Sequence, residues 1–442
     1  MIGNADKVSK VPELQKRILF TLGMLAIYRI GVYVPTPGVD AASLQQIIQA
    51  QQGNIVGFFN LFSGGALEQF SILTLNVMPY ITASIILQLL TMVFPALDRM
   101  NKSGEAGRKK FTQWTRYLTV GLAFVQGFAI ATTLEAQTGP GGEPIVLEAG
   151  WAFRFMTALT LTSGTIFLMW LGERITERGI GNGISLIIAA GIVARFPSAI
   201  GNTVALARSG ELATFAVMGL GIMALAVVGI IVYFERSARR IPVQYPRRTV
   251  GRRVYAGQTS HLPMRINPSG VIPVIFASSL LMFPITLGSW FGTGTAMSDF
   301  IERNFGPGDI IYNGIYVALT IFFCYFYTAV TFNPADVAEN LKKGGAYIPG
   351  IRPGHTTAAY IDRILMRIVF VGALYLSAVA VLPNILVTQA NVPFYFGGTS
   401  LLIVVGVALD TMQQIEGHLI SRNYDGLMGK GTKIQGRRVR MR

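Results

Sequence analysis

Long apolar runs alternate with polar stretches along the whole chain. Each run is long enough to cross the ~30 Å hydrocarbon core of a bilayer as a helix, which takes about 20 mostly apolar residues. The pattern therefore predicts an all-α, polytopic membrane protein. The ten predicted spans are residues 18–34, 72–94, 117–134, 152–171, 181–197, 213–234, 269–291, 310–331, 366–387 and 396–414.

The segment of residues 57–71 is apolar but too short to span a bilayer. As a helix of about 13 residues it would be roughly 20 Å long. Gly64 and Gly65 interrupt it, and in a helix each would lower stability by roughly 1 kcal/mol relative to alanine. The segment is expected to be either an interfacial helix or a re-entrant element buried in protein, and its composition leaves both open.

The composition agrees with a membrane protein, because 51% of the 442 residues are hydrophobic and 13% are charged. Soluble domains carry about 25% charged residues. The net charge of +15 is segregated by loop, which does not indicate a soluble nucleic-acid binder but does predict attraction for anions, including lipid headgroups. Of the 37 Lys and Arg residues, 32 lie in the segments 1–17, 95–117, 172–182, 235–267, 332–367 and 420–442.

This charge distribution also predicts the topology. Lys and Arg collect on the cytoplasmic side of transmembrane helices, and both termini are basic, so an even number of spans places both termini in the cytoplasm. The opposite loops agree, since residues 35–71 contain no Lys or Arg and residues 388–395 are uncharged. We expect the outlying arginines to lie near span ends and to reach the far interface by snorkelling. They are Arg29, Arg154, Arg195, Arg208 and Arg303.

Two of the predicted cytoplasmic loops are long. Residues 235–267 carry eight Arg against one acid, Glu235, and the turn residues within 245–255 favour a basic β-hairpin. Residues 332–367 read as a Gly/Pro-rich loop of fixed turns. The positive-inside bias alone accounts for their charge, but loops longer than about 12–15 residues are usually functional or disordered.

The sequence lacks the residues of a catalytic, metal or cofactor site. The apolar runs hold no carboxylate or histidine near a bilayer midplane, where ion-coupled carriers place them. Cys324 is the one cysteine, and Gly179–Gly183 follows no predicted strand, so neither a disulfide nor a dinucleotide site is expected. The protein is therefore expected to be a non-enzyme without cofactor, and a secondary transporter of small solutes stays the alternative function.

With no catalytic, metal or cofactor residues to consider, the remaining candidate functional residues are isoleucines at helical spacing. Ile81 and Ile85 are four residues apart, as are Ile188 and Ile192, so each pair lies on one helix face. Ordinary helix or lipid contact would explain such pairs. The other interpretation is a hydrophobic constriction that closes a pore by excluding water.

Several long stretches resemble the SecY family of protein-translocation channels, in the right order and on the right spans. The most specific is Asn76-Val-Met-Pro-Tyr-Ile-Thr-Ala-Ser-Ile-Ile86. The others are residues 168–185, 270–279, 332–334, 350–354 and 393–403. The resemblance covers essentially the whole chain.

This resemblance implies two inverted, pseudo-symmetric halves around a central hourglass pore, with spans 1–5 in residues 1–197, spans 6–10 in residues 213–414 and a basic tail in 415–442. It implies a waist of apolar side chains at Ile81, Ile85, Ile188, Ile192, Ile275 and Ile403. It also implies a plug at residues 57–70, with Phe58, Phe59, Leu61, Phe62, Gly64, Gly65 and Leu67.

The same resemblance implies a lateral gate formed by spans 2 and 7 with their neighbours 3 and 8. Its residues are Pro79, Ser84, Gln88, Pro273, Phe276 and Ser279. Prolines such as Pro79, Pro273 and Pro284 are expected to remove helix hydrogen bonds and to allow these helices to bend.

The loops 235–267 and 332–367 would dock the SecA ATPase or the ribosome, which supply the energy. The docking residues would be Arg247, Arg248, Arg252, Arg253, Lys342, Lys343 and Arg352. SecE and SecG, anionic lipids and signal-bearing polypeptides are the other implied partners, and the bacterial cytoplasmic (inner) membrane is the implied location.

Overall fold

The computed structural model describes residues 11–40, 43–46, 63–137, 144–210, 214–246, 248–250, 253–255, 259–288, 310–390 and 398–428. Several residues named above lie outside these ranges. They are Phe58, Phe59, Leu61 and Phe62 of the plug, Arg247 and Arg252 of the first long loop, and Arg303.

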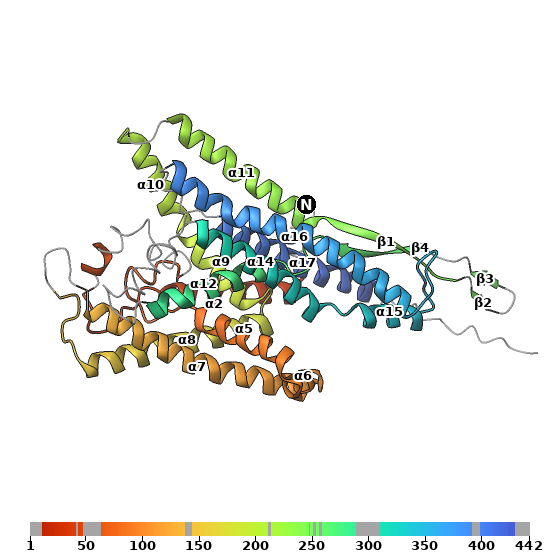
Figure 1. Cartoon of the computed structure of the whole chain (residues 1–442), viewed down its shortest axis with the longest axis horizontal. Coiled ribbons are helices and arrows are strands. Elements are labelled where there is room, and N and C mark those ends of the chain that lie inside the picture. The colour runs from red at the N-terminus through yellow and green to blue at the C-terminus, as the bar shows by residue number, and fades with distance from the viewer. Residues whose placement is uncertain are drawn as a thin grey trace, which may run out of the picture.

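A helix occupies each of the ten predicted spans (Figure 1). The first five are α2 (Pro12–Gly31), α5 (Met78–Val93), α7 (Glu105–Glu135), α8 (Trp151–Arg178) and α9 (Gly183–Ala194). The other five are α11 (Thr214–Arg236), α12 (Ile272–Gly288), α14 (Ile310–Thr331), α16 (His355–Ala390) and α17 (Gly398–Met428). By length and composition alone, six helices of the described residues could cross a membrane, or seven if a bent pair counts as one span.

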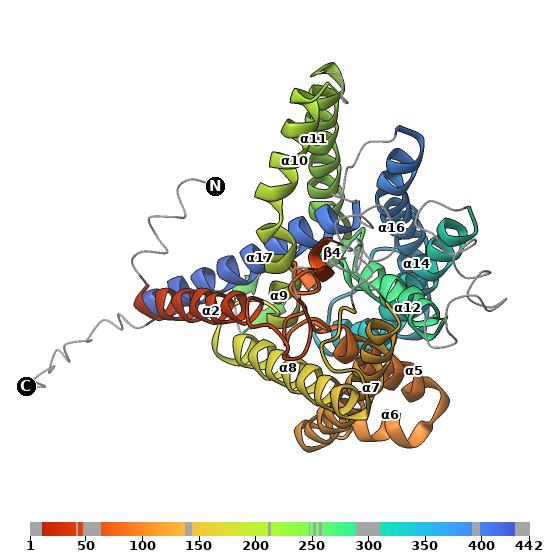
Figure 2. The same ribbon diagram turned by 90° about the vertical axis from the view of Figure 1, so that its left-hand side faces the viewer.

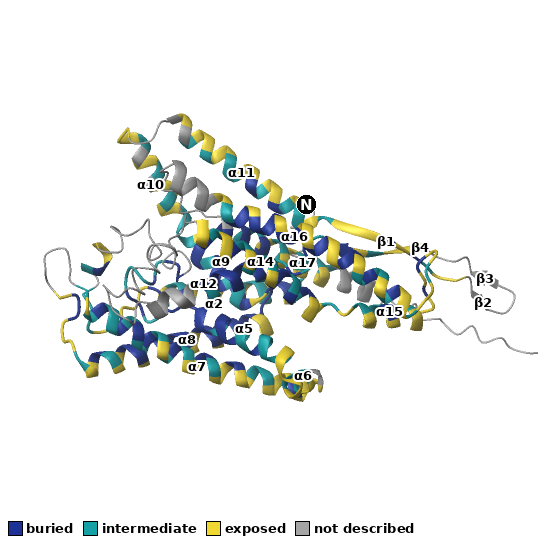
Figure 3. Ribbon diagram, viewed as in Figure 1, coloured by how far each residue is buried: buried dark blue, intermediate teal, exposed yellow. Residues whose placement is uncertain are grey.

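Two surfaces join the N-terminal helices to the C-terminal ones. Helix α5 contacts α12, and α9 contacts α17. Figure 2, which looks nearly along the bundle, shows α5 and α7 beside α12, and α9 close to the middle. In Figure 3 the buried residues lie along this central region, and the exposed residues lie mostly on the outside of the bundle. Outward-facing apolar residues such as Phe215 and Leu225 of α11, 87% and 74% exposed, suit a lipid environment.

Three further helices lie where the sequence predicted loops. They are α6 (Pro95–Lys102), α10 (Phe196–Arg208) and α15 (Pro334–Lys343). Each has a proline in its first turn, where the missing N–H costs no hydrogen bond and the fixed φ favours a helix start. The side chain of Asn333 caps α15 by accepting a hydrogen bond from the Ala335 N–H at 3.1 Å.

The prediction that residues 332–367 form a loop of turns is therefore wrong over most of that range. Helix α15 fills 334–343, and α16 already begins at His355. The turns are confined to the stretch between these helices, where Gly350 and Gly354 have φ of +81° and +115°. These conformations suit glycine, because it has no Cβ.

The predicted basic hairpin is confirmed and is longer than expected. Strands β1 (Ala238–Gln244) and β4 (Thr259–Arg265) pair antiparallel, and β2 (Arg248–Val250) pairs with β3 (Arg253–Tyr255). Figure 1 shows this ribbon projecting from one end of the helix bundle, near α15. Gln244 and Tyr347 exchange two backbone hydrogen bonds of 2.8 and 2.9 Å, which join the ribbon to the stretch after α15.

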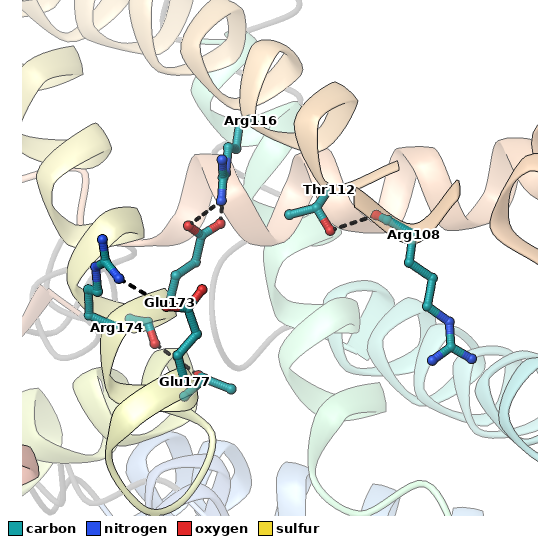
Figure 4. A network of polar contacts seen from close by, with 8 residues as sticks. Arg108, Thr112, Arg116, Glu173, Arg174 and Glu177 are labelled. Carbon is teal, nitrogen blue, oxygen red and sulfur yellow. Dashed lines mark hydrogen bonds and ion pairs between the residues drawn. The ribbon is translucent and has the colours of Figure 1, made fainter. Parts of the chain in front are cut away.

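Helices α7 and α8 pack tightly and are tied together by charge. A Cβ on Gly127 would lie 3.2 Å from the Cα of Ala158, so the two backbones approach closely. Figure 4 shows Arg116 of α7 donating to both carboxylate oxygens of Glu173 in α8, at 3.0 and 2.7 Å. A paired geometry of this kind fixes orientation as well as distance. The close backbone approach and the ion pair thus hold α7 and α8 together in the N-terminal half.

Candidate functional site

The six predicted waist residues are all buried in the interior of the bundle, within a large group of buried side chains that extends over both halves. All six isoleucines belong to one continuous cluster of buried side chains. They lie on α5, α9, α12 and α17, so both halves of the chain contribute. Their exposed fractions are 5% for Ile81, 2% for Ile85, 3% for Ile188, 0% for Ile192, 6% for Ile275 and 0% for Ile403.

Local capping sets the rotation of α9. The Asn182 side chain accepts hydrogen bonds from the N–H groups of Ile184 and Ser185, at 3.1 and 3.3 Å, and starts the helix there. From this start Ile188 and Ile192 fall on one face. Asn76 plays a related part before α5: it adopts φ of +51°, and its side-chain oxygen accepts from the Val77 N–H at 2.8 Å. Asparagine tolerates this left-handed conformation better than most residues.

The described part of the predicted plug segment is buried in protein. Ser63, Ala66 and Phe70 are 1%, 0% and 1% exposed, which favours the re-entrant interpretation over an interfacial helix. Gly64 and Gly65 lie in turns with φ of +68° and +91°, so the argument from lowered helix stability is wrong for them. Glycine is needed here for the left-handed backbone.

Two of the outlying arginines point into the protein and contact this segment. Arg29 of α2 donates from Nη1 to the Gly64 carbonyl oxygen at 2.8 Å, and Arg195, directly after α9, forms an ion pair with Glu68. Both arginines lie near span ends, as expected, and their guanidinium groups contact protein acceptors there. The expected reach to the membrane interface stays a prediction. Nothing in the apolar pattern predicted these contacts. The available signal was an arginine in a region otherwise free of cations, opposite an acid, Glu68, in residues 35–71.

The predicted gate helices α5 and α12 meet at Met78 and Ser279. The Ser279 hydroxyl of α12 approaches the Met78 sulfur of α5 at 3.6 Å and also lies 2.8 Å from the Ile275 carbonyl oxygen. Phe276 packs edge-on against Phe323 of α14, with ring centroids 5.7 Å apart. By contrast, the α9–α17 side includes a hydrogen bond of 2.9 Å from the Gly181 N–H to the Gln414 side chain.

Two other predicted gate residues interact within α5. The Gln88 amide donates to the Ser84 hydroxyl at 3.1 Å. Pro79 and Pro273 are buried in the first turns of α5 and α12, where a proline removes no helix hydrogen bond. The prediction that Pro79 and Pro273 remove helix hydrogen bonds is therefore wrong. Of the three prolines, only Pro284 lies in the interior of a helix, beyond the first turn.

A cavity of about 970 Å³ lies at the far end of α5 from Met78, where the end of α5 and α6 face the end of α14, the start of α15 and the first half of α16. Helix α6 turns away from α5 by 113°, which leaves room between the two halves. The lining combines apolar and polar side chains from both halves, including Met92 and Asn101 on one side and Thr328, Asp336 and Met366 on the other. A lining of this kind suits a segment with apolar and polar faces.

The described docking residues lie on the ribbon and on the neighbouring segment 334–354. Arg248 and Arg253 stand on β2 and β3. Lys342 and Lys343 are exposed at the end of α15, where Lys343 pairs with Glu339 at 2.9 Å. Arg352 is exposed between the turn glycines, and its carbonyl oxygen accepts from the Thr357 hydroxyl at 2.8 Å. The Gln244–Tyr347 pairing brings both basic stretches to the same end of the molecule.

The fold defines the class of protein first. A solved structure described as that of a protein-conducting channel superposes with a TM-score of 0.61, at 20% identity, over 97% of this chain and 99% of that one. The Sec61 channel in the canine ribosome-channel complex from the endoplasmic reticulum gives 0.54, at 19% identity, over 97% and 99% of the two chains. The bundle therefore has the fold of the protein-conducting channels.

Sequence comparison then gives the family. The SecY family model matches residues 71–412. The protein translocase subunit SecY of Escherichia coli (strain K12) is 50% identical over 422 residues, which cover 95% of each chain. The SecY subunit of Aquifex aeolicus is 46% identical over 416 residues, covering 94% of this chain and 96% of its own. The chain belongs to the SecY family.

Proposed function

We propose that this chain is the pore subunit of a channel that passes unfolded polypeptides across the bacterial cytoplasmic membrane and releases signal or transmembrane segments sideways into lipid. The observation that carries the proposal is the burial of six isoleucines from both halves in one cluster, beside the contact between α5 and α12. A surface of flexible apolar side chains suits many different polypeptides, because it offers no fixed hydrogen bond, and it excludes water when empty.

The channel is passive in this proposal, and partners supply the energy. Among the residues that the structure describes, no group of acidic, histidine and cysteine side chains could hold a metal. The exposed basic residues of the ribbon and of the segment 334–354 support docking of the SecA motor or of the ribosome, since both stretches lie at one end of the bundle. Solved relatives include an Ssh1 complex bound to the yeast 80S ribosome.

The proposal extends to the remaining assignments, which membership of the SecY family supports. Residues 57–70 act as the plug, and α5, α7, α12 and α14 form the lateral gate. SecE- and SecG-like subunits complete the channel in the membrane, with anionic lipids around its basic face. Both termini and the ribbon face the cytoplasm, because Lys and Arg concentrate there.

Reconstitution tests the function directly. Proteoliposomes holding this chain with SecE- and SecG-like subunits receive SecA, ATP and an unfolded precursor that carries a signal sequence. We expect the precursor to become protected from added protease, while the same precursor without its signal stays accessible. Counterflow of a labelled small solute without precursor protection would instead support the secondary transporter.

A further inference from the structure

Two arginines from different helices of the N-terminal half, α2 and the end of α9, contact the plug segment. Arg29 lies near the end of α2, and its guanidinium donates to the Gly64 carbonyl oxygen at 2.8 Å while stacking over Tyr33 at 5.2 Å. Arg195 follows the last residue of α9 and pairs with Glu68. Two guanidinium groups therefore contact the segment at residues four positions apart, Gly64 and Glu68.

The pair of Arg195 and Glu68 is largely withdrawn from water. The side chains are 19% and 17% exposed, which is well below the values for Lys343 and Glu339 on the surface of α15, at 69% and 60%. Charges in such a setting are weakly screened by salt. Removing one partner leaves the other charge uncompensated, so the loss exceeds that of an exposed ion pair.

The backbone of the segment also touches α9 directly. A Cβ on Gly64 would lie 2.8 Å from the Cα of Gly191 and 3.1 Å from the hydroxyl of Tyr28. A Cβ on Gly65 would meet nothing within 4 Å, although its φ of +91° is equally unusual. Gly64 is thus the point at which the segment rests against the helix that carries Ile188 and Ile192.

The stretch that follows the segment is fixed to the same half. The Thr36 N–H donates to the Phe70 carbonyl oxygen at 2.8 Å, and the Ile72 N–H donates to the Val34 carbonyl oxygen at 3.0 Å. A Cβ on Gly164 of α8 would lie 1.9 Å from the Ile72 oxygen. These hydrogen bonds, the ion pair and the close backbone approaches all join residues 63–72 to other residues of the N-terminal half, 1–197.

We propose that Arg195 and Arg29 are positioning residues that hold the plug segment on the N-terminal half and thereby set how readily the channel opens. The inference rests on the proposed channel function. Parting α5 from α12 leaves the contacts of both arginines in place. Release of the plug is therefore a separate step from gate opening, and it requires the Arg195–Glu68 pair and the Arg29–Gly64 hydrogen bond to break.

Charge reversal tests the pair. Arg195→Glu and Glu68→Arg are each expected to raise resting ion conductance across planar bilayers about tenfold, and to increase export of a precursor with a defective signal. The double variant restores the pair with its charges exchanged and should return both readouts toward the wild type. Arg208→Glu is the matched control, because Arg208 is exposed on α10 and likewise lies outside the basic loops.

A milder pair of variants covers the case in which charge reversal prevents insertion. Gly64→Ala should raise conductance clearly more than Gly65→Ala, because both strain the backbone but only the first collides with α9. Wild-type conductance in Arg195→Glu and in Gly64→Ala, with normal precursor export, would overturn the proposal. A double charge variant as leaky as the single ones would overturn the pairing. Failure of the wild type itself to export would instead refute the proposed function.

Discussion

Replacing Ile85 with asparagine should open a leak through the resting channel. Ile85 is 2% exposed and is one of the six buried isoleucines proposed to form the waist, called the isoleucine cluster below. Burying an isoleucine side chain contributes roughly 1.5–3 kcal/mol, which the substitution forfeits. An amide left without partners in a dry constriction costs a further 1–3 kcal/mol or so. Both changes favour water in the constriction, and their sum is roughly 2.5–6 kcal/mol. Even about 3 kcal/mol, near the lower end, raises the population of the hydrated state roughly 100-fold.

Single-channel recording in planar bilayers measures this population as resting conductance. Two matched variants test whether a leak comes from the polarity of the new side chain and from its position at Ile85. Ile85→Val keeps the site apolar and should stay near the wild-type conductance. Ile222→Asn places the same amide on α11, at a side chain 68% exposed toward the surroundings of the bundle, and should not conduct. If Ile85→Asn exports precursor normally and conducts no more than the wild type, the isoleucine cluster is not the seal.

Two other predictions concern the gate and the docking surface. Met78→Cys with Ser279→Cys, in a Cys324→Ala background that removes the one native thiol, should be joined by a short, reducible thiol-to-thiol crosslinker, because Ser279 Oγ and Met78 Sδ lie 3.6 Å apart and a cysteine at position 78 ends one bond short of that sulfur. The crosslink should stop export and its reduction should restore it, and full export by the crosslinked protein would exclude α5–α12 as the gate. Arg352→Glu should abolish SecA-driven export while the protein still inserts, because the exposed side chain would repel an acidic partner; export at the wild-type rate would refute its docking role.

The sequence predicted the spans well, because an apolar run of about 20 residues has few alternatives to a transmembrane helix. It did not predict α6, α10 or α15. These helices are short, and the prolines in their first turns, Pro95, Pro197 and Pro334, are residues that also end helices and form loops. A proline at the first turn of a helix and a proline in a loop look alike in a single sequence.

The waist could be placed only through the family resemblance. The spacing of Ile81 with Ile85, or of Ile188 with Ile192, defines a helix face but not what that face meets. Which faces meet depends on how the two halves are arranged, and no repeat is visible in the sequence. The same limit applies to Arg29 and Arg195, because a cation near a span end can reach either the membrane surface or an acceptor inside the fold.

The attachment of the plug segment to residues 1–197 has a consequence for biosynthesis. Chains are made from the N-terminus, and domains generally fold in that order. Arg29, Glu68, Gly191 and Arg195 have all left the ribosome before most of residues 213–414 exist. We expect a nascent molecule to place its plug segment on residues 1–197 before residues 213–414 complete the pore. A newly assembled channel would then be closed to ions from the start, and the host membrane would keep its proton gradient.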